Sequence, residues 1–345
     1  MKAFAIEQKE QCAFTTIDHI SPRNGEIVVA VKVLGLCGSD LKTYQGHNPM
    51  VEYPIIPGHE IACEVVEIGP GVPSGIAVGS RGTVMPYTKC GVCPACRSGR
   101  FNTCSTNRTM GVARPGAARP FMTVHHDDFI PCDGMDYSDI ALVEPLSVGR
   151  HAANRVPAVA GKLVLLYGLG IIGVGILIEL KRLGAKVIVA DVAADKLDLA
   201  LRLGADYALD IKDAEFDSTI DKLSGGMGLD IVFDAVGSAK IVESALSRTA
   251  VAATIVFVGY HTDTIPFNTK PIVSKELSVY GSRNALKADF EGSRDNLRSN
   301  PALKELLVTN RFAFSELAEA FRYWSENRGS VMKILVDMPE GERKW

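Results

Sequence analysis

Four cysteines lie within fifteen positions of this 345-residue chain: Cys90, Cys93, Cys96 and Cys104. Gaps of two residues let successive thiolates turn inward around one tetrahedral ion, which is how four sulfurs hold a structural Zn²⁺. Glycine and proline between the cysteines indicate a loop rather than a helix or a strand. A pair of disulfides is the alternative, but nothing in the sequence is typical of a secreted protein. We therefore predict a zinc-stabilised loop, which also directs attention to a second, open metal site.

Candidate ligands for that second site are Cys37, the His59-Glu60 pair and Glu144. A thiolate, an imidazole and a carboxylate form a mixed donor set that can leave one zinc position open, as catalysis requires. Singly, each has an ordinary explanation: a core cysteine, a surface His–Glu pair and a glutamate at a helix boundary. Together they favour a catalytic zinc, and the residues leave open which glutamate is the third ligand.

A glycine-rich turn follows the strand-like residues 163–167 and opens a helical pattern to about residue 183: Gly168, Gly170, Ile171, Ile172 and Gly173. Glycines permit a tight turn and close backbone approach, and the helix N-terminus offers unpaired N–H groups to a pyrophosphate. A second strand-like segment ends in Asp191, whose carboxylate suits both ribose hydroxyls of NAD and would repel the 2′-phosphate of NADP. We predict NAD binding; an ordinary βα turn without a ligand is the alternative.

The surrounding sequence indicates the elements that position these residues. Short β-branched runs in the first half predict an irregular, mainly antiparallel domain. From about residue 150, strands and helices alternate, which predicts a parallel sheet flanked by helices. The tail from about residue 296 contains helical patterns and a closing strand, and we expect it to pack on the first domain. The predicted domains are residues 1–149 with 296–345, and residues 150–295.

Composition limits the classes of function. Hydrophobic residues make up 47% of the chain and charged residues 22%, with a net charge of −3. No basic patch suited to nucleic acid or to a membrane surface is visible. The charged N-terminus does not fit a signal peptide, so we expect a cytoplasmic protein whose thiols bind metals.

These motifs together resemble the zinc-containing medium-chain dehydrogenase/reductase family, in the branch of sorbitol and threonine dehydrogenases. The resemblance rests on CGSD, PGHE, the four cysteines, VEPLSVG, GLGIIG and Asp191, which span nearly the whole chain. GHNP at 46–49 and GSRNA at 281–285 are similar to segments of L-galactonate and L-gulonate 5-dehydrogenases. The resemblance implies an α/β fold class, with a GroES-like, mainly-β catalytic domain and a Rossmann domain with a doubly wound parallel sheet.

The resemblance also implies a reaction and two Zn²⁺ ions per chain, one catalytic and one structural. A hydride would pass from a secondary alcohol of a polyol or sugar acid to NAD, with zinc as the Lewis acid. Cys37 and His59 would bind the catalytic zinc, with Glu60 and Glu144 binding directly or through water. Asp40 would fix the His59 ring.

Other implied roles concern protons, cofactor and substrate. Ser39 would hydrogen-bond the substrate hydroxyl, and Lys42 stands where relatives often carry a relay histidine. His47 is a candidate replacement, or an exposed loop histidine without that role. Gly259 is a further candidate cofactor contact. Arg283 could bind a substrate carboxylate, contact the cofactor or form a surface salt bridge.

One segment departs from the family's pattern. Its glycine-glycine-phenylalanine turn, which lines the substrate site in relatives, is replaced at residues 117–121 by AARPF. Two other hypotheses remain open: amino-alcohol oxidation of the threonine dehydrogenase kind, and a non-catalytic protein that binds NAD or zinc. Family members imply a homodimer or homotetramer, with a small-molecule polyol or sugar acid as substrate.

Overall fold

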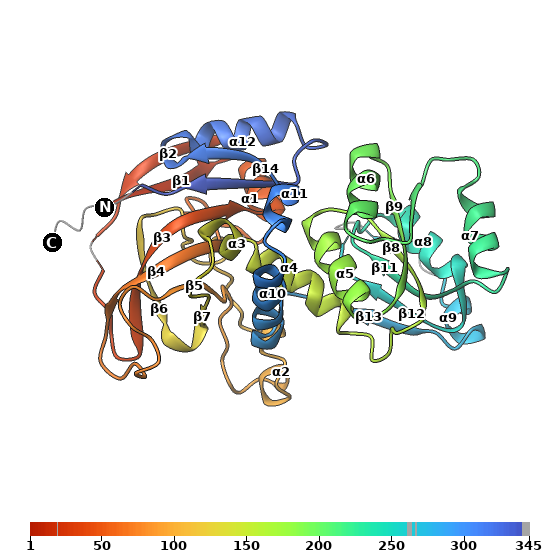
Figure 1. Ribbon diagram of the computed structural model, residues 1–345. Helices are drawn as coiled ribbons and strands as arrows, with labels where there is room; N and C mark the ends of the chain where they lie inside the picture. Colours follow the sequence, from red (N-terminus) through yellow and green to blue (C-terminus); the bar gives the residue numbers. More distant parts are fainter. Residues whose placement is uncertain (19, 261–263, 266–267, 340–345) are drawn as a thin grey trace. The chain divides into compact units, whose positions relative to one another are not determined.

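The computed structural model describes residues 1–18, 20–260, 264–265 and 268–339 (Figure 1). The chain forms two compact units, Met1–Pro145 with Leu286–Trp345, and Leu146–Ala285. The boundary expected before residue 296 lies before Leu286 instead, because helix α10 (Lys287–Ser299) contacts strand β7 and helix α3 of the first unit. None of the helices in the described ranges is long and apolar enough to cross a bilayer.

The first unit is mainly β and is closed by the C-terminal tail. Its strands are β1 (Lys2–Gln8), β2 (Gln11–Thr16), β3 (Glu26–Leu36), β4 (Glu60–Ile68), β5 (Arg81–Val84), β6 (Phe121–His125), β7 (Phe129–Pro131), β14 (Val308–Ala313) and β15 (Lys333–Asp337). Its helices include α1 (Gly38–Tyr44), α2 (Pro94–Arg97), α3 (Tyr137–Ala141), α10, α11 (Leu303–Leu307) and α12 (Leu317–Glu326). Helix α4 (Val143–Ala153) continues from this unit into the second.

Strand β3 lies at the centre of the first unit. The larger sheet has the order β14-β15-β3-β4-β5-β7, with β6 also paired to β3. β3 is apolar along most of its length and almost wholly buried, as a strand covered on both faces must be. The tail strand β15 pairs antiparallel with β3, so that Ile334 lies opposite Leu36. Phe321 and Trp324 of α12 are buried in the same core.

The second unit is a parallel sheet with the order β10-β9-β8-β11-β12-β13. Its strands are β8 (Leu163–Tyr167), β9 (Lys186–Asp191), β10 (Tyr207–Asp210), β11 (Leu229–Asp234), β12 (Thr249–Phe257) and β13 (Ser278–Gly281). Its helices are α5 (Ile171–Arg182), α6 (Ala194–Arg202), α7 (Phe216–Ser224), α8 (Ala239–Arg248) and α9 (Lys270–Ser274). Strand order reverses between β8 and β11, which is the doubly wound topology of dinucleotide-binding domains. This confirms the predicted fold class.

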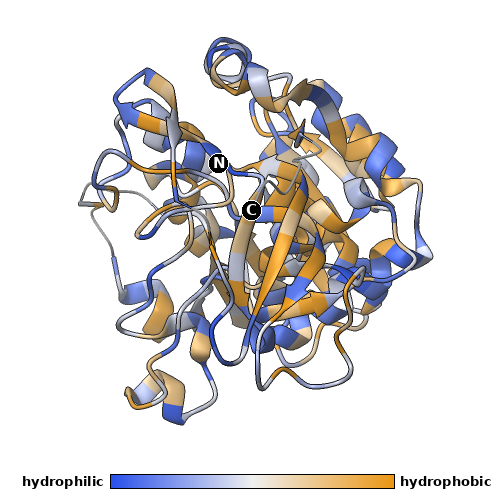
Figure 2. Cartoon of the chain, turned by 90° about the vertical axis from the view of Figure 1, so that its left-hand side faces the viewer, coloured by the Kyte–Doolittle hydropathy of each residue, from blue (hydrophilic) through white to orange (hydrophobic). Residues whose placement is uncertain are grey.

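Apolar strands form the interior of both units. Figure 2 colours long stretches of the central strands orange, the hydrophobic end of its scale, and these strands carry most of the fully buried side chains. In the second unit, β8 and β11 bury Leu165, Tyr167 and Val232 completely. The chemically active residues lie where these buried strands end, because the backbone leaves the sheet there and turns side chains out of the core.

Candidate active site

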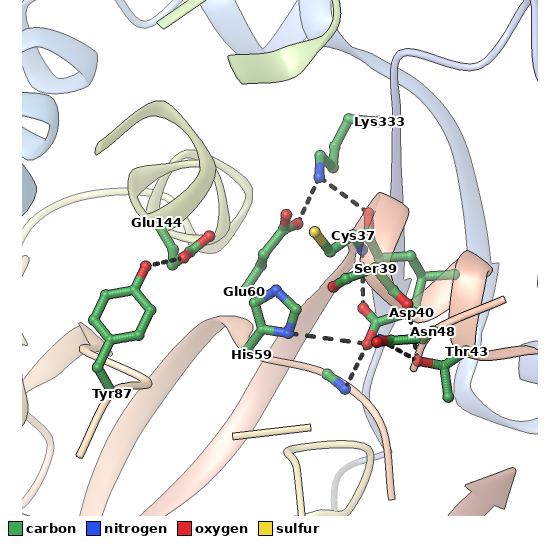
Figure 3. Close-up of polar contacts among 12 residues, drawn as sticks. Cys37, Ser39, Asp40, Thr43, Asn48, His59, Glu60, Tyr87, Glu144 and Lys333 are labelled. Carbon is green, nitrogen blue, oxygen red and sulfur yellow. Dashed lines mark hydrogen bonds and ion pairs between the residues drawn. The ribbon is translucent and has the colours of Figure 1, made fainter. Parts of the chain in front are cut away.

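Three of the predicted metal ligands meet at the end of β3 and the start of β4. The donor atoms of Cys37, His59 and Glu60 all lie within 4.8 Å of one another (Figure 3). Cys37 directly follows β3 and precedes helix α1, and Glu60 begins β4, the antiparallel neighbour of β3. His59 is 5% exposed and Glu60 is fully buried. The sheet register therefore brings together residues that are more than twenty positions apart in sequence.

Asp40 organises the loops around this cluster. Its carboxylate accepts the backbone N–H of Cys37 at 2.9 Å and that of Gly58 at 3.2 Å, which ties α1 to the segment before His59. The His59 Nδ1 atom lies 3.9 Å from Asp40 Oδ1, beyond hydrogen-bond distance (Figure 3). Asp40 thus lies beside the imidazole ring as expected, but it acts through its charge and through the backbone rather than through a hydrogen bond to the ring.

The charges in the cluster are strongly coupled. Burial lowers the pKa of His59, but the negative charges of Cys37, Asp40 and Glu144, together with a hydrogen bond to Cys37, outweigh it and hold that pKa well above its ordinary value. A cation placed among these groups would experience the same attractive field. The cluster therefore favours a positive charge, whether a proton or a metal ion.

Glu60 forms a buried ion pair that the sequence did not reveal. Lys333, at the start of β15, donates to Glu60 Oε2 at 2.6 Å and to the carbonyl oxygen of Leu36 at 3.0 Å. Each side chain of the pair is 1% exposed. Burial lowers the pKa of Lys333, but Glu60 and Cys37 more than compensate and raise it, so the lysine stays charged. One signal was available in the sequence: a single lysine entering an otherwise apolar closing strand.

Glu144 lies beside the cluster rather than inside it. It belongs to α4, is 3% exposed, and accepts a hydrogen bond from the Tyr87 hydroxyl at 2.8 Å. Burial is the main cause that raises the pKa of Glu144 to about 7, and Glu60 adds to the effect, whereas His59 opposes it. Burial and the charge of Glu144 also hold the pKa of Tyr87 well above its ordinary value, so Tyr87 stays a donor. Sequence reasoning missed Tyr87, for which no local signal exists.

These residues fit a zinc ion. Sulfur, imidazole nitrogen and carboxylate oxygen are the donors that zinc takes in open, catalytic sites. Glu60 Oε1 is buried and has no hydrogen-bond partner among the described residues. A buried polar atom without a partner is costly, and a bound cation would relieve that cost. Glu144 is not among the donors that lie within 4.8 Å of one another, so Glu60 is the glutamate that the geometry favours as the third ligand.

The predicted proton-transfer residues lie on or just after α1. Ser39 is half-buried, and its carbonyl oxygen accepts the Thr43 hydroxyl at 2.9 Å. Lys42 is exposed, as is His47, whose backbone N–H donates to the Lys42 carbonyl at 2.8 Å. Sequence reasoning did not single out Thr43 and Asn48, which are joined at 3.0 Å next to Ser39 (Figure 3).

The four-cysteine loop forms a second donor cluster. The sulfurs of Cys90, Cys93, Cys96 and Cys104 all lie within 4.8 Å of one another, and those of Cys90 and Cys96 are 4.0 Å apart. A tetrahedral zinc with bonds of about 2.3 Å places its sulfurs about 3.8 Å apart. Backbone N–H groups of Ser105 and Cys96 lower the pKa of Cys93 to about 5, which favours the thiolate that a metal needs. The arrangement fits a structural zinc.

The remaining cysteines are not part of either cluster. All eight cysteines are unpaired, which agrees with the expectation that disulfides are absent. Burial raises the pKa of Cys12 and of Cys132 to about 12, and it raises that of Cys63 well above its ordinary value. Thiols of this kind stay protonated and unreactive.

In the second unit, the glycine-rich turn has the conformation that its sequence predicts. Gly168 ends β8 with φ = +87°, in the left-handed region that favours glycine. Gly170 caps helix α5, whose first residues are Ile171 and Ile172. A Cβ atom at Gly173 would collide with the carbonyl oxygen of Gly168. The turn is therefore closed as tightly as glycine permits, and the N-terminus of α5 presents its backbone N–H groups at the end of β8.

Asp191 has a structural role that sequence reasoning did not anticipate. It ends β9 and accepts the backbone N–H of Leu169 at 2.7 Å, within the glycine-rich turn. Its other oxygen accepts the N–H groups of Val192 at 2.7 Å and Ala193 at 3.2 Å. The carboxylate is 9% exposed, so it can still share a lone pair with a ribose hydroxyl. Asp191 thus ties the end of β9 to the glycine-rich turn.

The two later cofactor candidates also lie at strand ends. Gly259 follows β12, and its N–H donates to the Asp234 carbonyl at 3.0 Å; a Cβ atom there would collide with the backbone of Gly237. Arg283 follows β13, is exposed, and interacts with another group in the structure. Both are placed in the second unit, with the glycine-rich turn.

Family models match both units. The model described as "Zinc-binding dehydrogenase" matches residues 168–299, and the "Alcohol dehydrogenase GroES-like domain" matches residues 23–134. L-galactonate-5-dehydrogenase of Escherichia coli K12 is 31% identical over 337 residues, 97% of this chain and 98% of that protein. A sorbitol dehydrogenase of Halalkalibacterium halodurans is 31% identical over 96% of this chain and 95% of its own.

A solved structure is similar over its whole length. It is described as a short chain alcohol dehydrogenase from E. coli CFT073, complexed with the cofactor NADH. Its TM-score is 0.90 at 29% identity, covering 98% of this chain and 99% of that chain. Agreement of both sequence and fold over nearly the full length excludes a chance match of one motif.

Proposed function

The chain belongs to the zinc-binding alcohol dehydrogenase family, an oxidoreductase family, and from that premise we propose that it uses NAD to oxidise a secondary alcohol of a polyol or sugar acid. The observation that carries the proposal is the meeting of Cys37, His59 and Glu60 donors within 4.8 Å. A non-catalytic protein would have no need to keep three converging ligands, one of which, Glu60, holds a buried oxygen without a hydrogen-bond partner.

Cys37, His59 and Glu60 would hold the catalytic zinc, with Glu144 beside them. Bound zinc would supply Lewis-acid stabilisation of charge on the alcohol oxygen, and bound NAD would accept the hydride. Asp40 holds the backbone N–H groups on either side of the cluster, so it fixes the positions of Cys37 and of the segment before His59. Lys333 compensates the charge of Glu60 and fixes the position of its carboxylate.

Ser39 would relay the proton of the substrate's hydroxyl, with Oγ accepting that proton while the serine's own hydroxyl proton passes on. It lies two residues after Cys37 and is half-buried, so it is close to the metal ligands and still accessible. His47 is exposed and would pass the proton to water, since an imidazole can accept a proton at one ring nitrogen and donate from the other; Lys42 is the alternative at this end of α1. This assignment of the relay is part of the proposal.

The second unit would bind NAD at the glycine-rich turn. Backbone N–H groups of residues 169–173 at the start of α5 would face the pyrophosphate, and Gly259 would let the chain approach the cofactor closely. Asp191 would accept a ribose hydroxyl. A 2′-phosphate there would meet a buried carboxylate, and residues 192–195 hold no arginine to neutralise it, so NAD is favoured over NADP.

Two zinc ions per chain are part of the same proposal, one in the Cys37 cluster and one in the four-cysteine loop. Assembly into a homodimer or homotetramer remains a prediction, which light scattering coupled to gel filtration would test. Relatives that act on L-galactonate and on sorbitol support a polyol or sugar-acid substrate. The carboxylates around the Cys37 cluster already have partners in the protein, so we keep amino-alcohol oxidation, which needs an acceptor for a substrate ammonium, as the weaker alternative.

The proposal is tested by NAD⁺ reduction across sorbitol, galactitol, L-galactonate, L-gulonate and L-threonine, with and without a zinc chelator. We expect turnover of at least one polyol or sugar acid, lost with the chelator and restored by added zinc. Cys37→Ala should be inactive, whereas Cys12→Ala, a cysteine outside both clusters, should keep full activity. Turnover of L-threonine alone, or activity that survives in Cys37→Ala, would contradict the proposal.

A further inference from the structure

An arginine in the turn at residues 117–121 lies next to the metal ligands and has no counter-ion. The turn is fixed by backbone hydrogen bonds: the N–H of Ala117 donates to the Gly58 carbonyl, and that of Ala118 to the Pro57 carbonyl, each at 3.0 Å. Gly58 immediately precedes His59 in sequence. Arg119 is therefore carried by a rigid segment that is anchored one residue away from the donor cluster.

The side chain of Arg119 is half-buried and unsatisfied. Its Nε atom is buried and has no hydrogen-bond partner, and no ion pair or hydrogen bond joins its guanidinium to any residue that the structure describes. Burial lowers the pKa of Arg119, and the positive charge of Arg114 lowers it further; no carboxylate opposes either effect. A guanidinium stays protonated even so, so the charge persists without compensation.

Arg114 is a nearby arginine whose hydrogen bonds give it a structural role, and it serves as a comparison for Arg119. It lies five residues earlier, is also partly buried, and donates to the carbonyl oxygens of Arg108 at 3.0 Å and Pro86 at 3.2 Å. Its hydrogen bonds account for its position. No such contact accounts for the position of Arg119, whose Nε atom is held out of water without a hydrogen-bond partner, which is unfavourable. We therefore expect the partner of the Arg119 guanidinium to be a group on a molecule that binds to the chain.

We propose that Arg119 binds an oxyanion on the substrate, so that the enzyme acts on a sugar acid or a polyol phosphate in preference to a neutral polyol. A planar guanidinium offers paired donors that match a carboxylate or a phosphate in a bidentate contact. Arg119 directly follows the two residues whose backbone is hydrogen-bonded to Pro57 and Gly58, the segment that leads into His59, so the proposal places the anion-binding group in the same part of the unit as the metal ligands. The inference rests on the proposed function and narrows its substrate class.

Arg283 is the weaker candidate for the same task. It is exposed, belongs to the second unit, and is not without a partner in the structure. The unsatisfied donor of Arg119, together with its anchoring beside the metal ligands, separates the two arginines.

The test compares matched substrates. Steady-state kinetics would be measured on galactonate against galactitol and gluconate against sorbitol, with galactitol 1-phosphate as the phosphate probe. The variants are Arg119→Gln and Arg119→Lys, and Arg114→Gln is the matched control. Binding of galactonate and of galactitol 1-phosphate to the zinc-loaded protein would be followed by calorimetry, which reports on the anion contact whether or not turnover occurs.

We expect Arg119→Gln to raise KM for the acid or the phosphate roughly 10- to 100-fold, the usual effect of losing a charge-assisted hydrogen-bond pair. Its kcat/KM for the neutral polyol should change less than about threefold, and Arg119→Lys should recover part of the loss. Which of the two anions binds more tightly identifies the source of the oxyanion. Arg119→Gln should unfold no earlier than wild type, because Arg119 has no partner to lose, whereas Arg114→Gln should unfold earlier and keep the preference for anions.

Other outcomes separate the two proposals. Wild-type turnover that favours neutral polyols, an equal loss on charged and neutral substrates, or a rise only in KM for NAD would each overturn the role of Arg119 and leave the proposed function intact. The absence of turnover on every substrate would contradict the proposed function. Calorimetry would then decide about Arg119 alone: anion binding that disappears in Arg119→Gln supports it, and binding that persists overturns it.

Discussion

Replacing Lys333 by methionine should destabilise the protein far more than removing a surface lysine. The variant keeps the aliphatic bulk but leaves Glu60 buried, charged and without its ion-pair partner. Lys333 Nζ lies 2.6 Å from Glu60 Oε2, a separation at which two unit charges attract by about 6 kcal/mol at an effective dielectric constant of 20. Removing one partner of a buried pair typically costs about 3–5 kcal/mol, since the remaining charge stays desolvated.

The hydrogen bond from Lys333 to the Leu36 carbonyl would be lost as well, which adds about 1 kcal/mol. We therefore expect Lys333→Met to lower the free energy of unfolding by about 3 kcal/mol or more, measured by urea denaturation of the metal-free protein, in which no zinc ion compensates the charge of Glu60. The matched control is Lys162→Met. Lys162 pairs with Asp230 at 3.3 Å but is half exposed, so its loss should cost less than about 1 kcal/mol.

A double variant isolates the cause. Glu60→Gln in the Lys333→Met background removes the uncompensated charge, so it should recover at least half of the lost stability. A cost for Lys333→Met no larger than that for Lys162→Met would refute the reasoning. Strictly additive losses in the double variant would refute it too, because they would show that the two residues do not act as a pair.

Three further predictions concern the glutamate beside the cluster, the nucleotide turn and the cysteine loop. Because burial raises the pKa of Glu144 to about 7, its contribution to the stability of the metal-free protein is present at acidic pH and is lost as pH rises through 7. Zinc binding to the Cys37 cluster should tighten over the same range; chelator competition at pH 6 and pH 8 would measure this, and an unchanged slope in Glu144→Gln would contradict it. Asp191→Gly should relax the preference for NAD over NADP and also lower the unfolding temperature, because three backbone N–H groups lose their acceptor; a constant NAD/NADP ratio of kcat/KM would count against the ribose contact. Cys96→Ser should lose one zinc and several kcal/mol of stability, since metal binding contributes folding energy, whereas Cys12→Ser should lose neither; equal zinc contents would show that the loop holds no metal.

Features of local sequence were predicted well. The spacing of the four cysteines brings their sulfurs together because a two-residue gap leaves the chain few other ways to turn. The glycine-rich turn needs a positive φ at Gly168 and no Cβ atom at Gly173. Glycine is the residue type that meets both requirements, so the sequence alone indicates them. The alternation of strands and helices was enough to predict the parallel sheet of the second unit.

Features that depend on tertiary pairing were not predicted. Lys333 reaches Glu60 only because β15 adds to β3, which joins residues 273 positions apart in sequence. The bond from Tyr87 to Glu144 likewise depends on how α4 lies beside the metal ligands. The boundary expected at residue 296 differs from the observed one, before Leu286, for a similar reason. Helix α10 follows β13 closely in the chain, and only its contacts with β7 and α3 assign it to the first unit. For Arg119, burial without a partner is invisible in the sequence.

The central claim is that Cys37, His59 and Glu60 hold a catalytic zinc that is distinct from the zinc of the cysteine loop. The most direct test is the zinc content per chain of purified wild-type protein and of Cys37→Ala, measured by plasma mass spectrometry alongside NAD⁺ reduction. We predict two zinc ions in the wild type and one in the variant, which should remain folded and lose turnover. Two zinc ions and undiminished turnover in Cys37→Ala would contradict the account.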